Sequence, residues 1–94
     1  MQKVSIIMTT YNCAEQLKKT LNSVIMQDYR PLEIVVKDGV SKDGTVEVIR
    51  SYAKKPGIDL VWESSPDGGI FDAMNQGFAM SSGSYLLFFN EIFL

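Results

Sequence analysis

The chain has 94 residues, of which 46% are hydrophobic and 21% charged, a composition typical of one ordinary globular domain. Its net charge is −2 and its basic residues are scattered, which argues against a nucleic-acid partner because phosphates are bound by clustered lysines and arginines. The sequence has no histidine and only one cysteine, Cys13, which excludes an imidazole base, an intramolecular disulfide and a cysteine metal cage. It has no apolar run long enough to cross a bilayer, and we expect a cytoplasmic protein without a transmembrane segment.

Strand and helix patterns alternate from the start of the chain. Residues 3–9 form a nearly continuous β-prone apolar run, which predicts a strand buried on both faces. Asn12 is the expected N-cap of a helix that extends to about Gln27, with apolar residues at helical spacing on one face. Residues 28–31 end this helix, because the proline at position 31 disfavours helical geometry in the residue before it.

The second strand and helix are predicted between residues 33 and 54. Residues 33–37 form another buried strand, and the turn-rich stretch 38–45 follows it. We expect Ser41 or Asp43 to cap a helix that runs to about Lys54. Its inward-facing residues are predicted to be Val46, Ile49 and Ala53.

The last third of the sequence repeats the alternation. Residues 58–63 form the third strand, 64–69 a loop and 84–89 the fourth strand. Residues 70–80 between them show a helical period. The side chains expected to face inward from this helix are Ile70, Met74 and Phe78, and those expected on the opposite face are Asp72, Asn75 and Gln76.

The resulting order β-α-β-α-β-α-β predicts an α/β fold with a mostly parallel, doubly wound sheet. Ligands bind such sheets outside the carboxyl ends of the strands. The segments after the predicted strands, residues 9–12, 38–39, 63–69 and 90–91, supply a ring, hydroxyls, amides and carboxylates, which suit a nucleotide. A dinucleotide-binding Rossmann domain is disfavoured, because Thr-Thr-Tyr-Asn stands where its glycine-rich turn would follow the first strand.

Three ordered motifs then carry a resemblance to a known family. They are VSIIMTTYN at residues 4–12, EIVVKDGVSKDGT at 33–45 and PDGGIFDAMNQG at 66–77. Together they resemble the family 2 glycosyltransferases, which are nucleotide-diphospho-sugar transferases with the GT-A fold. Residues 82–90 are similar to the strand that leads to the metal site of that family, so the resemblance covers nearly the whole chain. We interpret residues 1–94 as the N-terminal, nucleotide-sugar-binding part of such a domain, incomplete at its C-terminus.

The resemblance implies a nucleotide site built from four residues of this chain. Thr10 and Tyr11 would line the base and ribose pocket, Asp38 would accept a hydrogen bond from the base, and Asp72 would complete the nucleotide side. It also implies hexosyl transfer with inversion from a nucleotide-sugar donor, UDP-linked, to a hydroxyl of a saccharide or lipid-linked acceptor. The family uses a divalent cation, Mn²⁺ or Mg²⁺, and a downstream carboxylate base, so no catalytic residue is assigned within this chain.

Two departures from the family pattern stand out. Val40 occupies a position where the family usually has glycine or serine, a change that stiffens the loop. Residues 90–94, NEIFL, replace a pattern in which one or two aspartates follow an Asn-x pair. Ile92 and Phe93 have no oxygen donors for a hard cation, which leaves Glu91 as a weak candidate metal ligand. We therefore expect the isolated chain to bind nucleotide weakly and not to turn over.

Other interpretations of the same residues remain open. Asp38 with Gly39 is a common turn pair, Tyr11 is an aromatic ring that can pack over a sheet edge, and Asp72 suits a solvated helix face. A second hypothesis is a non-enzymatic module that binds nucleotide or self-associates, with the apolar residues 92–94 favouring a homodimer. Binding of uridine nucleotides without Mn²⁺ would favour this module, whereas metal-dependent binding would favour transferase architecture.

Overall fold

The computed structural model describes residues 2–26, 31–83 and 85–90. These residues form the predicted alternation of strands and helices. The elements are β1 (Val4–Thr10), α1 (Ala14–Ile25), β2 (Leu32–Asp38), α2 (Thr45–Ala53), β3 (Leu60–Ser64), α3 (Ile70–Met80) and β4 (Tyr85–Asn90). The expected end of the first helix at Gln27, the break over residues 28–30 and the first residue of the fourth strand, Ser84, lie outside the described residues.

The strands form one four-stranded sheet in the order β3-β2-β1-β4, and each neighbouring pair is parallel. The chain begins in the middle of the sheet, adds β2 and β3 on one side, and then crosses to the other side of β1. The strand order therefore reverses beside β1, which is where ligands bind in doubly wound sheets. The strand register also places Thr10, Asp38 and Ser64 in one row at the carboxyl ends of three strands.

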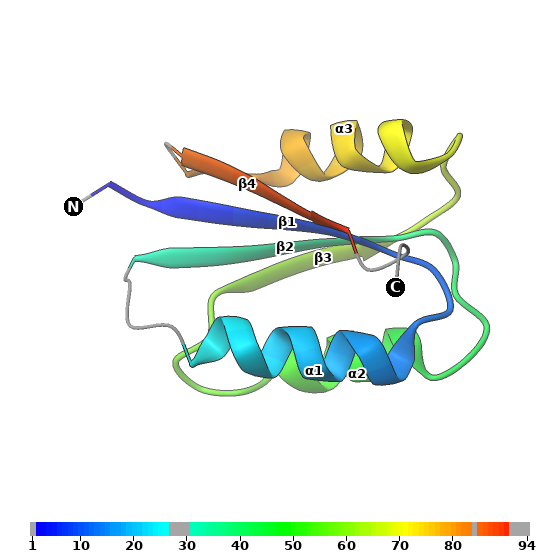
Figure 1. Cartoon of the computed structure of the whole chain (residues 1–94), viewed down its shortest axis with the longest axis horizontal. Helices are drawn as coiled ribbons and strands as arrows, with labels where there is room; N and C mark the ends of the chain where they lie inside the picture. The colour runs from blue at the N-terminus through cyan, green and yellow to red at the C-terminus, as the bar shows by residue number, and fades with distance from the viewer. Residues whose placement is uncertain (1, 27–30, 84, 91–94) are drawn as a thin grey trace.

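Helices cover both faces of the sheet. In Figure 1, α1 and α2 lie together against one face and α3 lies against the other. Between the sheet and the helix pair, the main core includes Met8, Leu17, Leu21, Val36 and Ile49, all with completely buried side chains. Full burial of an aliphatic side chain stabilises a fold by about 1.5–3 kcal/mol, so this layer holds α1 and α2 in place.

The contact between α3 and the sheet depends on small residues. Ala73 and Gly77 are the buried residues of α3. A Cβ atom built on Gly77 would lie 2.6 Å from Cγ2 of Ile7, so only glycine permits this approach. The prediction that Phe78 faces inward was wrong, because that side chain is 53% exposed. The small residues of α3 face β1 and β2, and its bulkiest side chains are turned outward.

The expected helix caps were also wrong. The N-cap of α1 is Cys13, and the N-cap of α2 is Gly44. Asn12 instead has a left-handed backbone with φ of 49°. The carboxylate of Asp43 accepts hydrogen bonds from the backbone N–H groups of Thr45 at 2.9 Å and Ala14 at 3.3 Å, so one side chain ties together the starts of both helices.

The buried face of α2 differs from the predicted one. Thr45, Val48, Ile49 and Tyr52 are buried, whereas Val46 and Ala53 are only half-buried. The hydroxyl of Tyr52 donates a hydrogen bond of 2.6 Å to Oδ1 of Asn22 on α1. The helix therefore turns its aromatic residue towards α1, and this packing across the two helices was invisible in the spacing of its aliphatic residues.

The buried carboxylate of Glu33 forms a hydrogen-bonded cluster at the amino ends of the strands. Glu33 accepts hydrogen bonds from Oγ of Ser5 at 2.7 Å and from the backbone N–H of Ser82 at 2.9 Å, and Lys3 lies 3.8 Å away. Burial opposes ionisation of Glu33, but the hydrogen bonds from Ser5 and Ser82 outweigh it and hold the pKa below the ordinary value. This cluster joins β1, β2 and the segment after α3.

Candidate functional site

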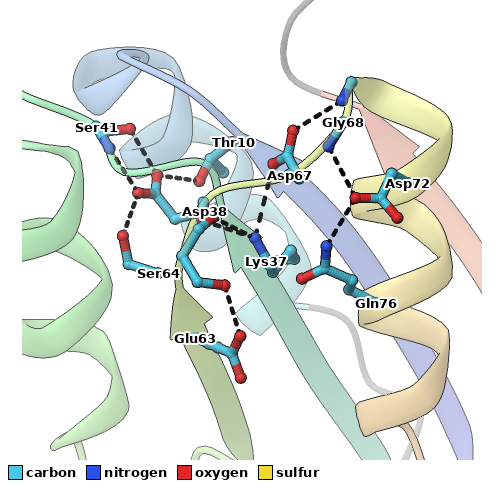
Figure 2. Close-up of polar contacts among 12 residues, drawn as sticks. Thr10, Lys37, Asp38, Ser41, Glu63, Ser64, Asp67, Gly68, Asp72 and Gln76 are labelled. Atoms are coloured by element: carbon cyan, nitrogen blue, oxygen red, sulfur yellow. Dashed lines mark hydrogen bonds and ion pairs between the residues drawn. The ribbon is translucent and has the colours of Figure 1, made fainter.

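The carboxyl ends of β1, β2 and β3 are joined by the side chain of Asp38. Its Oδ1 accepts hydrogen bonds from the hydroxyls of Thr10 at 2.7 Å and Ser41 at 2.6 Å. Its Oδ2 accepts from the backbone N–H of Ser41 and the hydroxyl of Ser64, both at 2.8 Å. Figure 2 shows these donors converging on the carboxylate from three sides. Asp38 therefore fixes the relative positions of the three strand ends and the loop after β2.

The environment of Asp38 favours its ionised form. The residue is completely buried, and burial by itself disfavours the charge. The donors on Ser41, Thr10 and Ser64 more than offset this effect and lower the pKa of the carboxyl group below its ordinary value. A carboxylate offers about four lone-pair sites, and here four hydrogen bonds occupy them. In this arrangement Asp38 organises the residues around it.

Two residues with left-handed backbone geometry lie in the loops beside this cluster. Asn12 and Val40 both have positive φ angles, of 49° and 63°. The backbone N–H of Asn12 donates to Oγ of Ser41 at 2.8 Å, and Oδ1 of Asn12 accepts from the backbone N–H of Lys42 at 2.7 Å. The loops after β1 and β2 are therefore held together, and Val40 keeps a conformation that is costly for a β-branched residue.

An open pocket of about 620 Å³ lies at the carboxyl ends of the strands. This volume falls within the range of small-molecule sites. The ring of Tyr11 is 51% exposed and provides an aromatic surface in the pocket wall. The lining residues come from the segments after β1, β2 and β3 and from the start of α3: Thr9, Thr10, Tyr11, Gly39, Val40, Lys42, Pro66, Asp67, Gly69, Ile70 and Ala73.

Asp72 holds the loop before α3. Its Oδ2 accepts hydrogen bonds from the backbone N–H of Gly68 at 2.8 Å and from Nε2 of Gln76 at 2.9 Å, as Figure 2 shows. The bond from the Gly68 N–H is the main reason why the pKa of Asp72 lies below its ordinary value, and the bond from Gln76 adds to it. Asp72 is exposed and does not line the pocket.

The structure thus places the four predicted residues in different positions. Thr10 and Tyr11 line the pocket, Asp38 lies buried beside Thr10, and Asp72 stands at the start of α3. Glu91 lies outside the described residues. Among the residues that are described, no group of three or more histidine, cysteine, aspartate or glutamate side chains comes together to hold a metal ion.

Four further residues that shape the site were not among the site residues predicted from the sequence. Ser41 and Ser64 donate to Asp38, while the buried Lys37 forms an ion pair with Asp67 in the pocket wall. A signal existed for Ser41, because an aspartate followed three residues later by serine is a common side-chain-bonded turn. A signal also existed for Lys37, which interrupts a run of residues predicted to be buried on both faces.

None of the helices in the described part of the chain is both long enough and apolar enough to span a bilayer.

Comparison with known proteins identifies the family. Residues 5–91 match the model of the family described as Glycosyl transferase family 2. An uncharacterized glycosyltransferase of Mycobacterium tuberculosis is 42% identical over 89 residues, which cover 94% of this chain and 33% of that protein. A PGL/p-HBAD biosynthesis glycosyltransferase of Mycobacterium bovis is 37% identical over 84 residues, covering 89% of this chain and 33% of the relative. The chain spans about one third of the length of these curated relatives.

Solved structures agree with this assignment. A mannosyltransferase from Pyrobaculum calidifontis, solved in complex with GDP-Man and Mn²⁺, superposes with a TM-score of 0.89 at 29% identity, covering 96% of this chain and 27% of that one. TarS of S. aureus, in complex with UDP-GlcNAc, gives a TM-score of 0.81 at 28% identity over 95% of this chain and 26% of that one. The predicted α/β fold of GT-A type is confirmed. The chain belongs to glycosyl transferase family 2.

Proposed function

We propose that the whole protein transfers a sugar from a nucleoside diphosphate sugar to an acceptor hydroxyl with inversion, and that the pocket at the strand ends binds the nucleotide of the donor. The observation that carries this proposal is the pocket beside Thr10 and Tyr11, at the edge where a doubly wound sheet binds its ligands. Its volume of about 620 Å³ suits a nucleotide. Membership of the family supports the proposed reaction.

Each predicted site residue has a role in this proposal. The exposed ring of Tyr11 stacks on the base. Thr10 lines the base and ribose pocket and gives its hydroxyl hydrogen to Asp38. Asp38 and Asp72 contribute to nucleotide binding by holding Thr10, Ser41 and Gly68 in place.

The donor we propose is UDP-linked, with a saccharide or lipid-linked acceptor, and the proposed compartment is the cytoplasm. TarS supports the choice of uridine, since it was solved with UDP-GlcNAc, and the mannosyltransferase solved with GDP-Man makes guanosine the comparison to test. The same mannosyltransferase complex contains Mn²⁺, which supports a divalent cation for the whole protein.

For the 94-residue chain by itself we propose nucleotide binding without turnover. The chain spans about one third of its curated relatives, so most of the residues in those proteins have no counterpart in it. A pocket that binds nucleotide without metal would instead support the second candidate, a non-enzymatic binding module. The observation that favours this candidate is the sequence NEIFL at residues 90–94, in which Ile92 and Phe93 stand where the family pattern has oxygen-bearing metal ligands.

Calorimetric titration tests the proposal. UDP and GDP are titrated into the chain with and without Mn²⁺, and into the Tyr11→Ala variant. We expect saturable one-to-one binding to the wild type and an affinity about tenfold lower for Tyr11→Ala, because base–aromatic stacking contributes about 1–3 kcal/mol. Tyr52→Phe, which removes a hydroxyl remote from the pocket, is the matched control and is expected to bind like the wild type. Failure of both nucleotides to saturate the wild type at millimolar concentration, with or without Mn²⁺, would refute the proposed function.

A further inference from the structure

Lys37 is a completely buried lysine beneath the proposed nucleotide pocket. It is the penultimate residue of β2, and its stem runs on the α3 side of the sheet. A Cβ atom on Gly77 of α3 would lie 3.9 Å from the Cβ of Lys37. A buried lysine needs partners for its charge, because an isolated ammonium group is costly away from water.

The amine of Lys37 contacts three groups on the segments around the pocket. Nζ donates to the backbone carbonyl oxygens of Ser65 at 2.7 Å and Asp38 at 3.1 Å, and it lies 3.6 Å from Oδ2 of Asp67. Figure 2 shows the amine of Lys37 between Asp38 and Asp67. An ammonium has three N–H donors, of which the two carbonyl hydrogen bonds use two, and the carboxylate of Asp67 balances its charge. The side chain therefore ties the loop after β3 to the end of β2.

Asp67 is the partner that reaches the pocket. It belongs to the lining residues, and its Oδ1 accepts a hydrogen bond from the backbone N–H of Gly69 at 3.1 Å. A Cβ atom on Gly39 would lie 2.9 Å from Oδ2 of Asp67, so the carboxylate packs directly on the backbone after β2. The ion pair with Lys37 thus fixes both the position of residues 65–69 and the direction of the Asp67 carboxylate.

The charge of Lys37 matters for the kind of ligand that enters. A nucleoside diphosphate is an anion, and a carboxylate in the pocket wall repels it unless a cation compensates that charge. For stability alone a buried ion pair is a poor choice, since apolar residues of similar volume often do as well or better. The ammonium therefore supplies a positive charge beside the pocket, which a buried methionine of similar length would not supply.

We propose that Lys37 is a positioning residue for the nucleotide pocket. It holds the loop of residues 65–69 against the strand ends and compensates the charge of Asp67, so that the pocket wall accepts an anionic nucleotide. Lys37 does not touch the ligand, because its side chain is completely buried below the wall. This inference rests on the proposed function, since it assumes that the pocket binds a nucleotide.

The test compares Lys37→Met, Asp67→Asn and the double variant with the wild type. Lys19→Met, which removes one positive charge from an exposed position on α1, is the matched control. We expect Lys37→Met to bind UDP about tenfold more weakly and the amides of residues 65 and 67–69 to exchange their hydrogens about tenfold faster. Adding Asp67→Asn to Lys37→Met should recover about half of the lost binding free energy, because the uncompensated carboxylate is gone. Lys19→Met should match the wild type.

The outcomes separate this inference from the proposed function. Wild-type affinity and wild-type exchange in Lys37→Met would overturn the inference, and so would a double variant that binds no better than Lys37→Met. If the wild type itself does not bind UDP, the proposed function fails. The tether is then rejected as well only if hydrogen exchange over residues 65–69 is unchanged in Lys37→Met. If Lys37→Met does not fold, Asp67→Asn alone decides, since the tether requires faster exchange at Gly69 in that variant.

Discussion

The hydroxyl of Thr10 donates a hydrogen bond of 2.7 Å to Oδ1 of Asp38, across the row where β1 and β2 end side by side. Both residues are almost completely buried, so this bond lies in a region of low dielectric constant, where hydrogen bonds to a charged group are strong. It links the strand that carries Tyr11 to the strand that carries the Ser41 turn. The geometry of the pocket floor therefore depends on a contact between two side chains.

Replacing Thr10 by valine keeps the shape of the side chain and removes this bond. We expect the free energy of unfolding to fall by about 2 kcal/mol, the cost typical of a lost hydrogen bond to a charged acceptor. Urea denaturation followed by circular dichroism measures the change. Thr10→Ser keeps a hydroxyl and should lose less than half as much stability. Equal losses in the two variants would show that packing of the methyl group, and not the hydrogen bond, is what Thr10 provides.

The two buried carboxylates predict how stability depends on pH. Glu33 and Asp38 have pKa values below their ordinary values of 4.5 and 3.8 in the folded chain. A lowered folded pKa means that the unfolded chain binds protons first, so their contribution is present above the unfolded pKa and is lost as pH falls through the folded pKa. We expect the unfolding free energy to change little from pH 7 to about pH 5.5 and to decline below about pH 4.5.

Glu33→Gln provides the variant for this experiment. The substitution removes one of the titrating groups, so the decline of the unfolding free energy below pH 4.5 should be shallower than in the wild type, even though the variant is less stable at neutral pH. Glu47→Gln on the exposed face of α2 serves as the control and should keep the wild-type slope. The same slope in Glu33→Gln and the wild type would contradict the assignment of a lowered pKa to Glu33.

We predict that replacing Val40 by glycine raises the stability of the fold. Its φ of 63° costs a non-glycine residue about 1–2 kcal/mol, whereas glycine adopts the same backbone freely but loses more entropy on folding. We expect Val40→Gly to raise the unfolding free energy by about 0.5–1 kcal/mol, measured by thermal or urea denaturation. Val40→Ala retains a Cβ atom and should show no such gain. A destabilised Val40→Gly would mean that the side chain packs more favourably than its 38% exposure indicates.

We predict that adding a single methyl group at Gly77 lowers the stability of the fold. A methyl group at this position would lie 2.6 Å from Cγ2 of Ile7, so α3 must move away from β1. We expect Gly77→Ala to lower the unfolding free energy by about 1–3 kcal/mol, as overpacked substitutions do, despite the better helix propensity of alanine. Gly68→Ala, whose Cβ would have its nearest neighbour at 3.6 Å, is the matched control and should cost less. Equal stability in Gly77→Ala and the wild type would place α3 further from the sheet.

Much of the fold was predictable because its elements are marked by local patterns. The buried runs that became β1 and β2 are nearly continuous and β-prone, and parallel strands joined by helices admit few arrangements. The prediction was wrong where a contact between elements far apart in the sequence determines which way a side chain faces. Phe78 faces outward because α3 approaches Ile7 through Gly77, and no local period reveals that closeness.

The candidate site was predictable in part for the same reason. Thr10 and Tyr11 follow β1 directly, so the topology alone places them at the ligand-binding edge. Lys37 and Asp67 were missed because thirty residues separate them, and their pairing depends on how the loop after β3 folds back over β2. The role of Asp38 as a fully bonded organiser likewise emerges only when Thr10, Ser41 and Ser64 are seen around it.

The most direct test of a nucleotide pocket at the strand ends is a titration of ¹⁵N-labelled chain with UDP, followed by amide chemical shifts. We expect saturable shifts at Thr10, Tyr11, Gly39 and Gly69 around the pocket, with little change at Glu33 and Ser82 at the opposite end of the sheet. Shifts confined to the Glu33 end, or no saturable shifts at the pocket amides with UDP or GDP in the presence of Mn²⁺, would contradict it.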